Sequence, residues 1–150
     1  MYSTTVCHVV AGDRATVYAA LLDPAAVARW RVPDGMTGEV HELDARLGGR
    51  IRMSLTYDDP AVAGKSDGAT DTYAGRFVEI VTGERVVEEV AFESADPGLR
   101  GTITMTTTLR DLPDGTEVEI AMDGVPDGVP PEQNELGTRM ALDKLARLVG

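Results

Sequence analysis

The chain has 150 residues, of which 43% are apolar and 26% charged, a composition typical of one globular domain. Its 25 acidic and 14 basic side chains give a net charge of -11, which argues against nucleic acid as a partner because phosphate backbones bind basic surfaces. No apolar run approaches the roughly 20 residues that span a bilayer and no secretory signal pattern begins the chain, so we expect no membrane association. The single cysteine excludes an internal disulfide, and we expect a cytoplasmic protein.

The first part of the chain predicts one strand followed by two short helices. Residues 4–10 are rich in β-branched side chains, which favour a strand. Asp13 can cap a helix whose apolar positions 17, 18, 21 and 22 share one face. Asp23 and Pro24 end that helix and begin a second one, which we expect to end near Trp30.

The middle of the chain predicts an antiparallel sheet. Apolar and polar residues alternate over four segments, each of which predicts a strand: 50–57, 86–92, 102–112 and 117–122. Short turns rich in glycine, proline and aspartate separate most strands, which favours hairpins because a parallel crossover needs about a dozen residues. The one longer loop, residues 58–69, is polar and glycine-rich, and loops of that length are often functional or mobile.

A long helix is predicted from Pro131 to nearly the end of the chain. Its expected apolar face is formed by Thr138, Ala141, Leu142, Leu145, Ala146, Leu148 and Val149. One apolar helix face and one apolar sheet face must cover each other, so the pattern predicts an α+β fold. Leu136 and Met140 lie off this face and would suit a contact between subunits, which leaves both a monomer and a homodimer open.

Several motifs spread over the chain carry a resemblance to a known family. In order they are 21–24 with Trp30, Pro33-Asp34-Gly35-Met36-Thr37-Gly38, Gly48-Gly49-Arg50, Tyr73-Ala74-Gly75-Arg76-Phe77-Val78-Glu79, Thr106-Thr107-Thr108-Leu109 and 131–146. Together they resemble bacterial proteins similar to the C-terminal domain of the Hsp90 ATPase activator, the AHSA1-like group of the START/Bet v 1-like (SRPBCC) superfamily. The resemblance covers essentially the whole chain, which we expect to be a single domain over residues 1–150.

The resemblance implies a helix-grip fold and a ligand pocket. In this fold a curved antiparallel sheet of about six or seven strands wraps around a long C-terminal helix, with two short helices after the first strand. Members of the family commonly have tryptophan where this chain has Thr138 and serine where it has Ala141. Because both positions are expected to face the sheet, the missing indole should leave either a wider cavity or a collapsed one.

The expected ligand-binding residues lie on the inward faces of these elements. They are Trp30, Met53, Leu55, Tyr57, Tyr73, Phe77, Glu88, Phe92, Met105, Thr138, Ala141 and Leu142. The aromatic rings offer stacking surfaces, and the flexible thioethers of the methionines adapt to irregular apolar shapes. The same side chains would also suit an ordinary hydrophobic core.

Glu88 is the most informative polar residue of the sequence. It shares a strand face with Val86 and Phe92, whereas Glu89 points the other way. If that face is the inner one, the carboxylate must pair with a cation or stay protonated, because an unpaired buried charge costs too much free energy. Arg76, on the preceding strand, is a candidate partner. Glu88 would then anchor a ligand's polar group, act as an acid or base, or form a structural ion pair.

The sequence offers little else for catalysis. It has no phosphate-binding glycine-rich loop, no nucleophile elbow and no metalloprotease motif. The two histidines, His8 and His41, lie on separate predicted strands, so we expect no metal and no cofactor. Cys7 points to the opposite face from its neighbour His8, and we expect a buried, inert thiol.

Three functions stay open from the sequence. The first, favoured by the resemblance, is a protein that binds a small hydrophobic molecule in an apolar pocket without covalent chemistry. The second is an enzyme similar to the polyketide cyclases or aromatases of the same superfamily, in which Glu88, Tyr57 and Arg76 would transfer protons. The third is a co-chaperone of an Hsp90-type ATPase, which we favour least because the activators use a separate N-terminal domain that we do not expect here.

Overall fold

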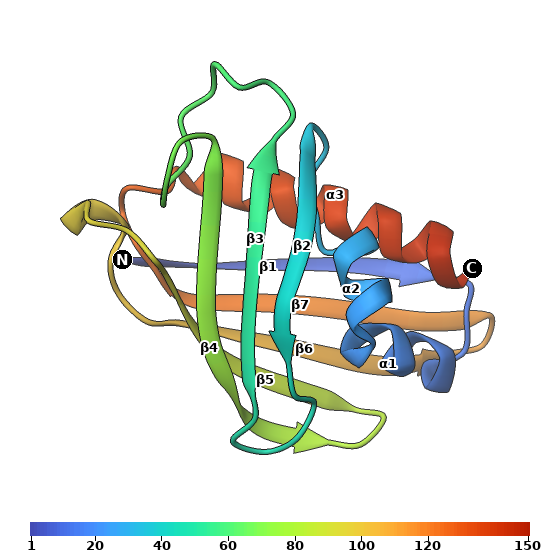
Figure 1. Ribbon diagram of the computed structural model, residues 1–150. Coiled ribbons are helices and arrows are strands. Elements are labelled where there is room, and N and C mark those ends of the chain that lie inside the picture. Colours follow the sequence, from blue (N-terminus) through green and yellow to red (C-terminus); the bar gives the residue numbers. More distant parts are fainter.

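Seven antiparallel strands form one curved sheet with the helices on its inner side, as Figure 1 shows for the computed structural model of residues 1–150. The elements are β1 (Tyr2–Val10), α1 (Arg14–Leu22), α2 (Pro24–Trp30), β2 (Met36–Leu43), β3 (Arg50–Tyr57), β4 (Thr70–Val81), β5 (Arg85–Phe92), η1 (Pro97–Leu99), β6 (Ile103–Leu112), β7 (Gly115–Val125) and α3 (Pro131–Val149). The strands lie in the order β1-β7-β6-β5-β4-β3-β2, so only β1 pairs with a strand far away in the chain. The predicted helix-grip fold is confirmed.

Capping residues fix the two short helices where the sequence predicts them. Asp13 accepts a hydrogen bond from the backbone N–H of Thr16 at 2.8 Å, which begins α1. Asp23 does the same for Ala26 at 3.3 Å, and Pro24 occupies the first turn of α2. The chain therefore passes from β1 through two successive helices before it enters β2.

Alternation along the strands separates an apolar inner face from a polar outer face. On β6, Ile103, Met105 and Leu109 are buried, whereas Thr104 and Thr106 on the other face are only partly covered. The outer face carries most of the charged residues of the sheet, and no helix covers it (Figure 1). The inner face is the one that meets the helices.

The helices divide the inner face between them. Helix α3 packs on β1, α1 and α2, and it buries Thr138, Ala141, Leu142 and Leu145 there. The inner faces of β3, β4 and β5 lie instead in a second core cluster with Val27 and the residues that follow α2. The strands farthest from β1 are thus covered by the end of α2 rather than by α3.

Cys7 lies on the outer face, which makes the expectation of a buried thiol wrong. It is exposed, and its Sγ lies 3.6 Å from Oε2 of Glu119 on the neighbouring strand β7. Desolvation and the nearby Glu119 carboxylate raise the pKa of the thiol, so it is protonated at neutral pH. No helix combines the length and the hydrophobicity that crossing a membrane requires.

The indole of Trp30 holds α1 and α2 together, which gives a stability prediction. Trp30 is 2% exposed, and its Nε1–H donates to the carbonyl oxygen of Ala20 at 2.9 Å. We expect Trp30→Phe to lower the free energy of unfolding by about 1–3 kcal/mol, because the buried carbonyl loses its donor. Urea denaturation followed by circular dichroism measures this, with the half-buried Tyr18→Phe as control. Equal stability of the two variants would contradict it.

Candidate functional site

A buried ion pair joins the end of α2 to the middle of the sheet. Nη1 of Arg31 lies 3.1 Å from Oε2 of Glu88 and Nη2 lies 2.9 Å from Oε1, so the guanidinium donates two hydrogen bonds to one carboxylate. The side chain of Arg31 is 11% exposed and that of Glu88 3%. Two such bonds are the geometry that best offsets the loss of hydration of two charges in the interior.

Local backbone structure brings the two partners together. Arg31 ends α2: its N–H still bonds to the carbonyl of Val27, but its ψ of 46° turns the chain off the helical path. Glu88 lies on β5, opposite Phe77 of β4 and Met105 of β6. Glu88 thus faces inward, and of the two states that the sequence allows for an inner carboxyl group, paired with a cation or protonated, the structure shows the paired one.

Arg76, the partner considered from the sequence, does not reach Glu88. The strand register places Arg76 opposite Glu89 and places Phe77 opposite Glu88. The guanidinium of Arg76 is 65% exposed on the outer face, and its Nη2 lies 4.0 Å from Oε2 of Glu89. Arg76 and Glu88 are therefore on opposite sides of the sheet.

Burial and charge have opposing effects on the groups of the pair. Burial by itself lowers the pKa of the Arg31 guanidinium, but Glu88 and Tyr73 together outweigh this effect and the pKa ends above its usual range. Burial also raises the pKa of the Tyr73 phenol; Glu88 adds to this increase, whereas Arg31 opposes it. At neutral pH Arg31 is a fixed cation and Tyr73 is uncharged.

Aromatic and thioether side chains surround the ion pair. The guanidinium carbon of Arg31 lies 5.4 Å from the centroid of the Tyr73 ring, within the range of a cation–π contact. The hydroxyl of Tyr73 donates to Sδ of Met53 at 3.2 Å. The ring of Phe92 meets that of Tyr73 edge to face, with 6.5 Å between centroids. The Arg31–Glu88 pair thus lies among aromatic and thioether side chains.

One edge of this lining is less tightly closed. Met36, Leu55 and Phe92 are only partly buried against the second core cluster. Their register partners place them near the loop of residues 58–69, which joins β3 to β4 and extends beyond the sheet in Figure 1. We call this edge, defined by Met36, Leu55 and Phe92, the loop edge.

A second ion pair fastens the loop to the loop edge. Nζ of Lys65 lies 2.8 Å from Oδ2 of Asp71, and the backbone N–H of Lys65 donates to Oδ1 at 2.6 Å. The ammonium group also lies 5.4 Å from the centroid of the Phe92 ring. The side chain of Asp71 is 5% exposed, so this contact is part of the interior rather than of the surface.

Six of the predicted ligand-binding residues contact Arg31 directly or through one neighbour: two touch Arg31, two touch Tyr73, and two lie opposite Glu88 in the sheet. They are Met53, Tyr73, Phe77, Glu88, Phe92 and Met105. Leu55 lies at the loop edge, and Tyr57 lies at the end of β3 outside both core clusters. Trp30, Ala141 and Leu142 belong to the first core cluster, with α1, β1 and β7.

Two parts of this site were missed by reasoning from the sequence. Arg31 directly follows the predicted end of a helix, and Lys65 and Asp71 lie in and just after a loop. The alternation of apolar and polar residues along a strand gives no information about side chains at the end of a helix or in a loop. The one signal in the sequence was that a buried Glu88 carboxylate would need a cationic partner. That partner is Arg31, which lies 57 residues away in the chain.

Comparison with known proteins assigns the fold to a family. The family model for Activator of Hsp90 ATPase homolog 1-like protein matches residues 12–150. Protein CV1439 of Chromobacterium violaceum is 35% identical, with a TM-score of 0.88 over 99% of this chain and 96% of that one. The chain belongs to the AHSA1 family.

More distant structures share the fold. An AHSA1-like protein from Aeromonas hydrophila is 18% identical, with a TM-score of 0.74 over 98% of this chain and 91% of that one. A protein of Rhodobacter sphaeroides is 20% identical, with a TM-score of 0.78 over 98% and 91%. No curated protein matches the chain. Membership of the AHSA1 family therefore establishes the fold, which is consistent with the START/Bet v 1-like superfamily. A ligand or an activity has to be argued from the residues of the site.

The surroundings of Thr138 are those of a closed core. Thr138 is 7% exposed, and its hydroxyl donates to the carbonyl of Asn134 at 2.9 Å. The side chain of Asn134 fills the next turn: it accepts from the hydroxyl of Thr4 at 2.6 Å and contacts Sδ of Met122 at 3.3 Å. Thr138 lines neither the hollow on the outer face of the sheet nor the one beside α1 and α2. The sequence predicts either a wider cavity or a collapsed one where Thr138 replaces the tryptophan of the family, and the structure favours the collapsed cavity.

The buried ion pair gives a prediction about coupling. Arg31→Met and Glu88→Leu should each cost about 3–5 kcal/mol of unfolding free energy, because each leaves one buried charge without a partner. The double variant should lose much less than the sum, since it leaves no charge. Urea denaturation of the unmodified protein, the two single variants and the double variant measures the coupling free energy between the two residues.

An ion pair on the outer face of the sheet supplies a matched control for this double-mutant cycle. Arg52 donates two hydrogen bonds to Glu93 at 2.8 and 2.9 Å, but both side chains are more than 40% exposed. The coupling of Arg52→Met with Glu93→Leu should be below about 1 kcal/mol because water screens it. Equal coupling in the two cycles would contradict a special role for the interior pair.

The packing around Thr138 gives a second prediction. We expect Thr138→Trp to lower the unfolding free energy by about 1–3 kcal/mol, because a filled core must move to accept an indole. Leu136→Trp, at a 54% exposed position of the same helix, is the control and should change stability little. Thermal denaturation compares them, and an unchanged or raised stability for Thr138→Trp would reveal empty volume instead.

Proposed function

We propose that this AHSA1 protein binds a small, largely apolar molecule at the inner face of β3, β4 and β5, and that Arg31 receives the molecule's polar end. The observation that carries this proposal is the Arg31–Glu88 pair, one charged group in a lining of aromatic and thioether side chains. Small-molecule sites have this composition: mostly apolar walls with a few placed polar groups that fix orientation.

The guanidinium of Arg31 has more N–H donors than its two hydrogen bonds to Glu88 use. An arginine side chain carries five N–H donors, and Glu88 receives two hydrogen bonds from Arg31. Because the charge is fixed, an oxygen of a ligand gains a charge-assisted hydrogen bond that water cannot replace in the closed interior. Tyr73 and Phe92 would offer their rings to the apolar body of the same ligand.

Entry of a ligand requires movement at the loop edge. Of the hollows in the molecule, one lies on the outer face of β4 and β5 and another beside α1, α2 and the end of α3, so neither of these two offers the ligand space next to Arg31. The half-buried Leu55 and Phe92 have less packing to lose than the fully buried members of the second core cluster. The contact of Lys65 with Asp71 and Phe92 would have to loosen with them.

The enzyme alternative has less support from the geometry. Glu88 is paired inside the sheet, Arg76 lies on its outer face and Tyr57 lies at the end of β3, so the three groups do not converge on one reacting atom. No observation on this chain favours the co-chaperone alternative. Ligand binding is therefore the function that the site supports best.

Thermal denaturation with matched probes tests the proposal. We expect decanoate and decanol, two molecules with the same apolar chain and different polar ends, to raise the melting temperature, because ligands that bind the folded state stabilise it by mass action. The gain should shrink in the Arg31→Met/Glu88→Leu variant and persist in Arg52→Met/Glu93→Leu. The absence of stabilisation by either probe, with no small molecule retained in native mass spectrometry of the purified protein, would contradict the proposal.

A further inference from the structure

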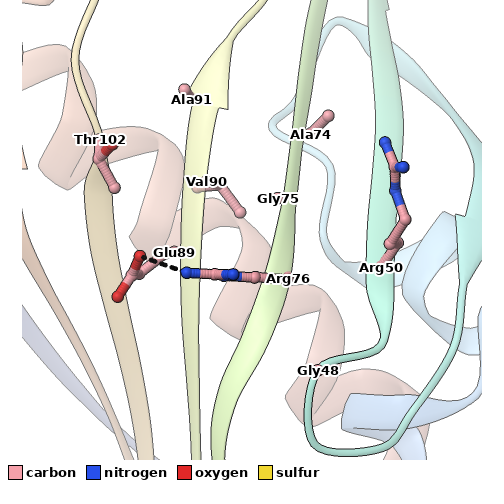
Figure 2. A pocket seen from close by; sticks show the side chains of 9 residues that line it. All are labelled: Gly48, Arg50, Ala74, Gly75, Arg76, Glu89, Val90, Ala91 and Thr102. Atoms are coloured by element: carbon pink, nitrogen blue, oxygen red, sulfur yellow. Dashed lines mark ion pairs between the residues drawn. The ribbon is translucent and has the colours of Figure 1, made fainter.

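A hollow of about 420 Å³ lies on the outer face of the sheet, away from the interior site. Figure 2 shows its floor, formed by Ala74 and Gly75 of β4 and Ala91 of β5, and its rim, which includes Arg50, Arg76 and Glu89. The floor is low because these three residues have the smallest side chains. The hollow is open to solvent, since no helix covers this side of the sheet (Figure 1).

Two arginines extend from neighbouring strand positions at this rim, Arg76 toward Glu89 and Arg50 along β3 (Figure 2). Arg50 of β3 and Arg76 of β4 are direct register partners, so their side chains leave the same face of the sheet side by side. Cβ atoms of such partners are roughly 5 Å apart, and like charges placed opposite each other destabilise a sheet. The carboxylates of Glu42 and Glu89, 3.9 Å from Arg50 and 4.0 Å from Arg76, offset part of this repulsion, and an anion bound beside the two arginines would offset more of it.

Neither arginine has its hydrogen-bonding capacity used by a carboxylate. The nearest acidic oxygens lie 3.9 Å from Nε of Arg50, on Glu42, and 4.0 Å from Nη2 of Arg76, on Glu89, beyond hydrogen-bond distance. By contrast, Arg52 on the same face is bound to Glu93 at 2.8 Å.

The backbone around the hollow is held in place. The loop before β3 is tied to β4 by two hydrogen bonds, from the N–H of Gly48 to the carbonyl of Phe77 at 2.8 Å and from the N–H of Phe77 to the carbonyl of Gly49 at 2.9 Å. Gly49 has no room for a Cβ, which would lie 2.0 Å from the carbonyl oxygen of Asp44. The segments 48–50 and 73–79, which carry much of the family resemblance, therefore meet here in one fixed arrangement.

We propose that this hollow binds a small organic anion, with its carboxylate or phosphate group on Arg50 and Arg76 and its uncharged body on the floor of Ala74, Gly75 and Ala91. Guanidinium groups match the planar geometry of both oxyanions and bind them with two hydrogen bonds each. Glu89, whose Oε2 lies 4.0 Å from Nη2 of Arg76, repels a second negative charge in the hollow, which favours ligands with a single anionic group at one end. The net charge of -11 opposes anions at long range, so binding depends on these local donors.

NMR titration tests the proposal with three probes that share one ring. Phenyl phosphate and benzoate carry the two anionic groups, and benzyl alcohol is the uncharged control. We expect saturable shifts of the Nε–H signals of Arg50 and Arg76 and of the amides of Ala74 and Ala91 with at least one anion. Saturation by phenyl phosphate alone indicates a phosphate ester as the ligand, and saturation by benzoate alone indicates a carboxylate.

Matched variants show whether the two arginines are responsible. Arg50→Gln and Arg76→Gln should each weaken binding at least fivefold, because each removes a charged donor. Arg52→Gln, on the same face but already bound to Glu93, should leave the affinity unchanged. Shifts that follow sodium chloride at matched ionic strength, equal shifts with benzyl alcohol, or saturable binding that survives both substitutions would overturn the proposal. Shifts confined to Arg31 and its neighbours would also overturn it, since they would report only the interior site.

Discussion

The burial of one arginine and one glutamate constrains the rest of this structure. Two charges taken out of water are costly unless each meets the other with good geometry, and Arg31 and Glu88 do so with two hydrogen bonds. This requires α2 to end at Trp30 so that Arg31, the next residue, can turn inward, and it requires β5 to keep the register that points Glu88 away from solvent. The ring of Tyr73 covers the pair and shields it from water.

This constraint explains how the helices share the sheet. Helix α3 covers β1 and contacts α1 and α2, whereas β3 to β5 are closed by the end of α2 and by the ion pair that it contributes. Both core clusters are mainly aliphatic, but only the second contains a buried ion pair, which lies beside Tyr73, Phe77 and Met53. The second cluster is better suited to recognise a molecule that has one polar end.

The sequence predicts the helices and strands well, because the apolar repeat of a helix, the alternation of a strand and the capping residues are all visible over a few neighbouring residues. Asp13, Asp23 and Pro24 mark the helix boundaries found in the structure, and alternation correctly turns Glu88 inward. Partners depend on tertiary contacts, so the choice of Arg76 for Glu88 was wrong: the strand register, and Arg31 from a distant helix end, decide it. For Cys7 the alternation was right, and the general tendency of cysteine to be buried was misleading.

The mobility of the Arg31 guanidinium in solution tests the central claim most directly. A guanidinium held by two hydrogen bonds to a buried carboxylate rotates slowly about its Cζ–Nε bond, so NMR of the uniformly ¹⁵N-labelled protein should resolve separate Nη1 and Nη2 signals for Arg31. The exposed arginines at positions 50 and 76 should each give one averaged signal, which provides the internal reference. One averaged signal for Arg31 would show that the pair is not fixed, and would contradict both the structural account and the proposed anchor.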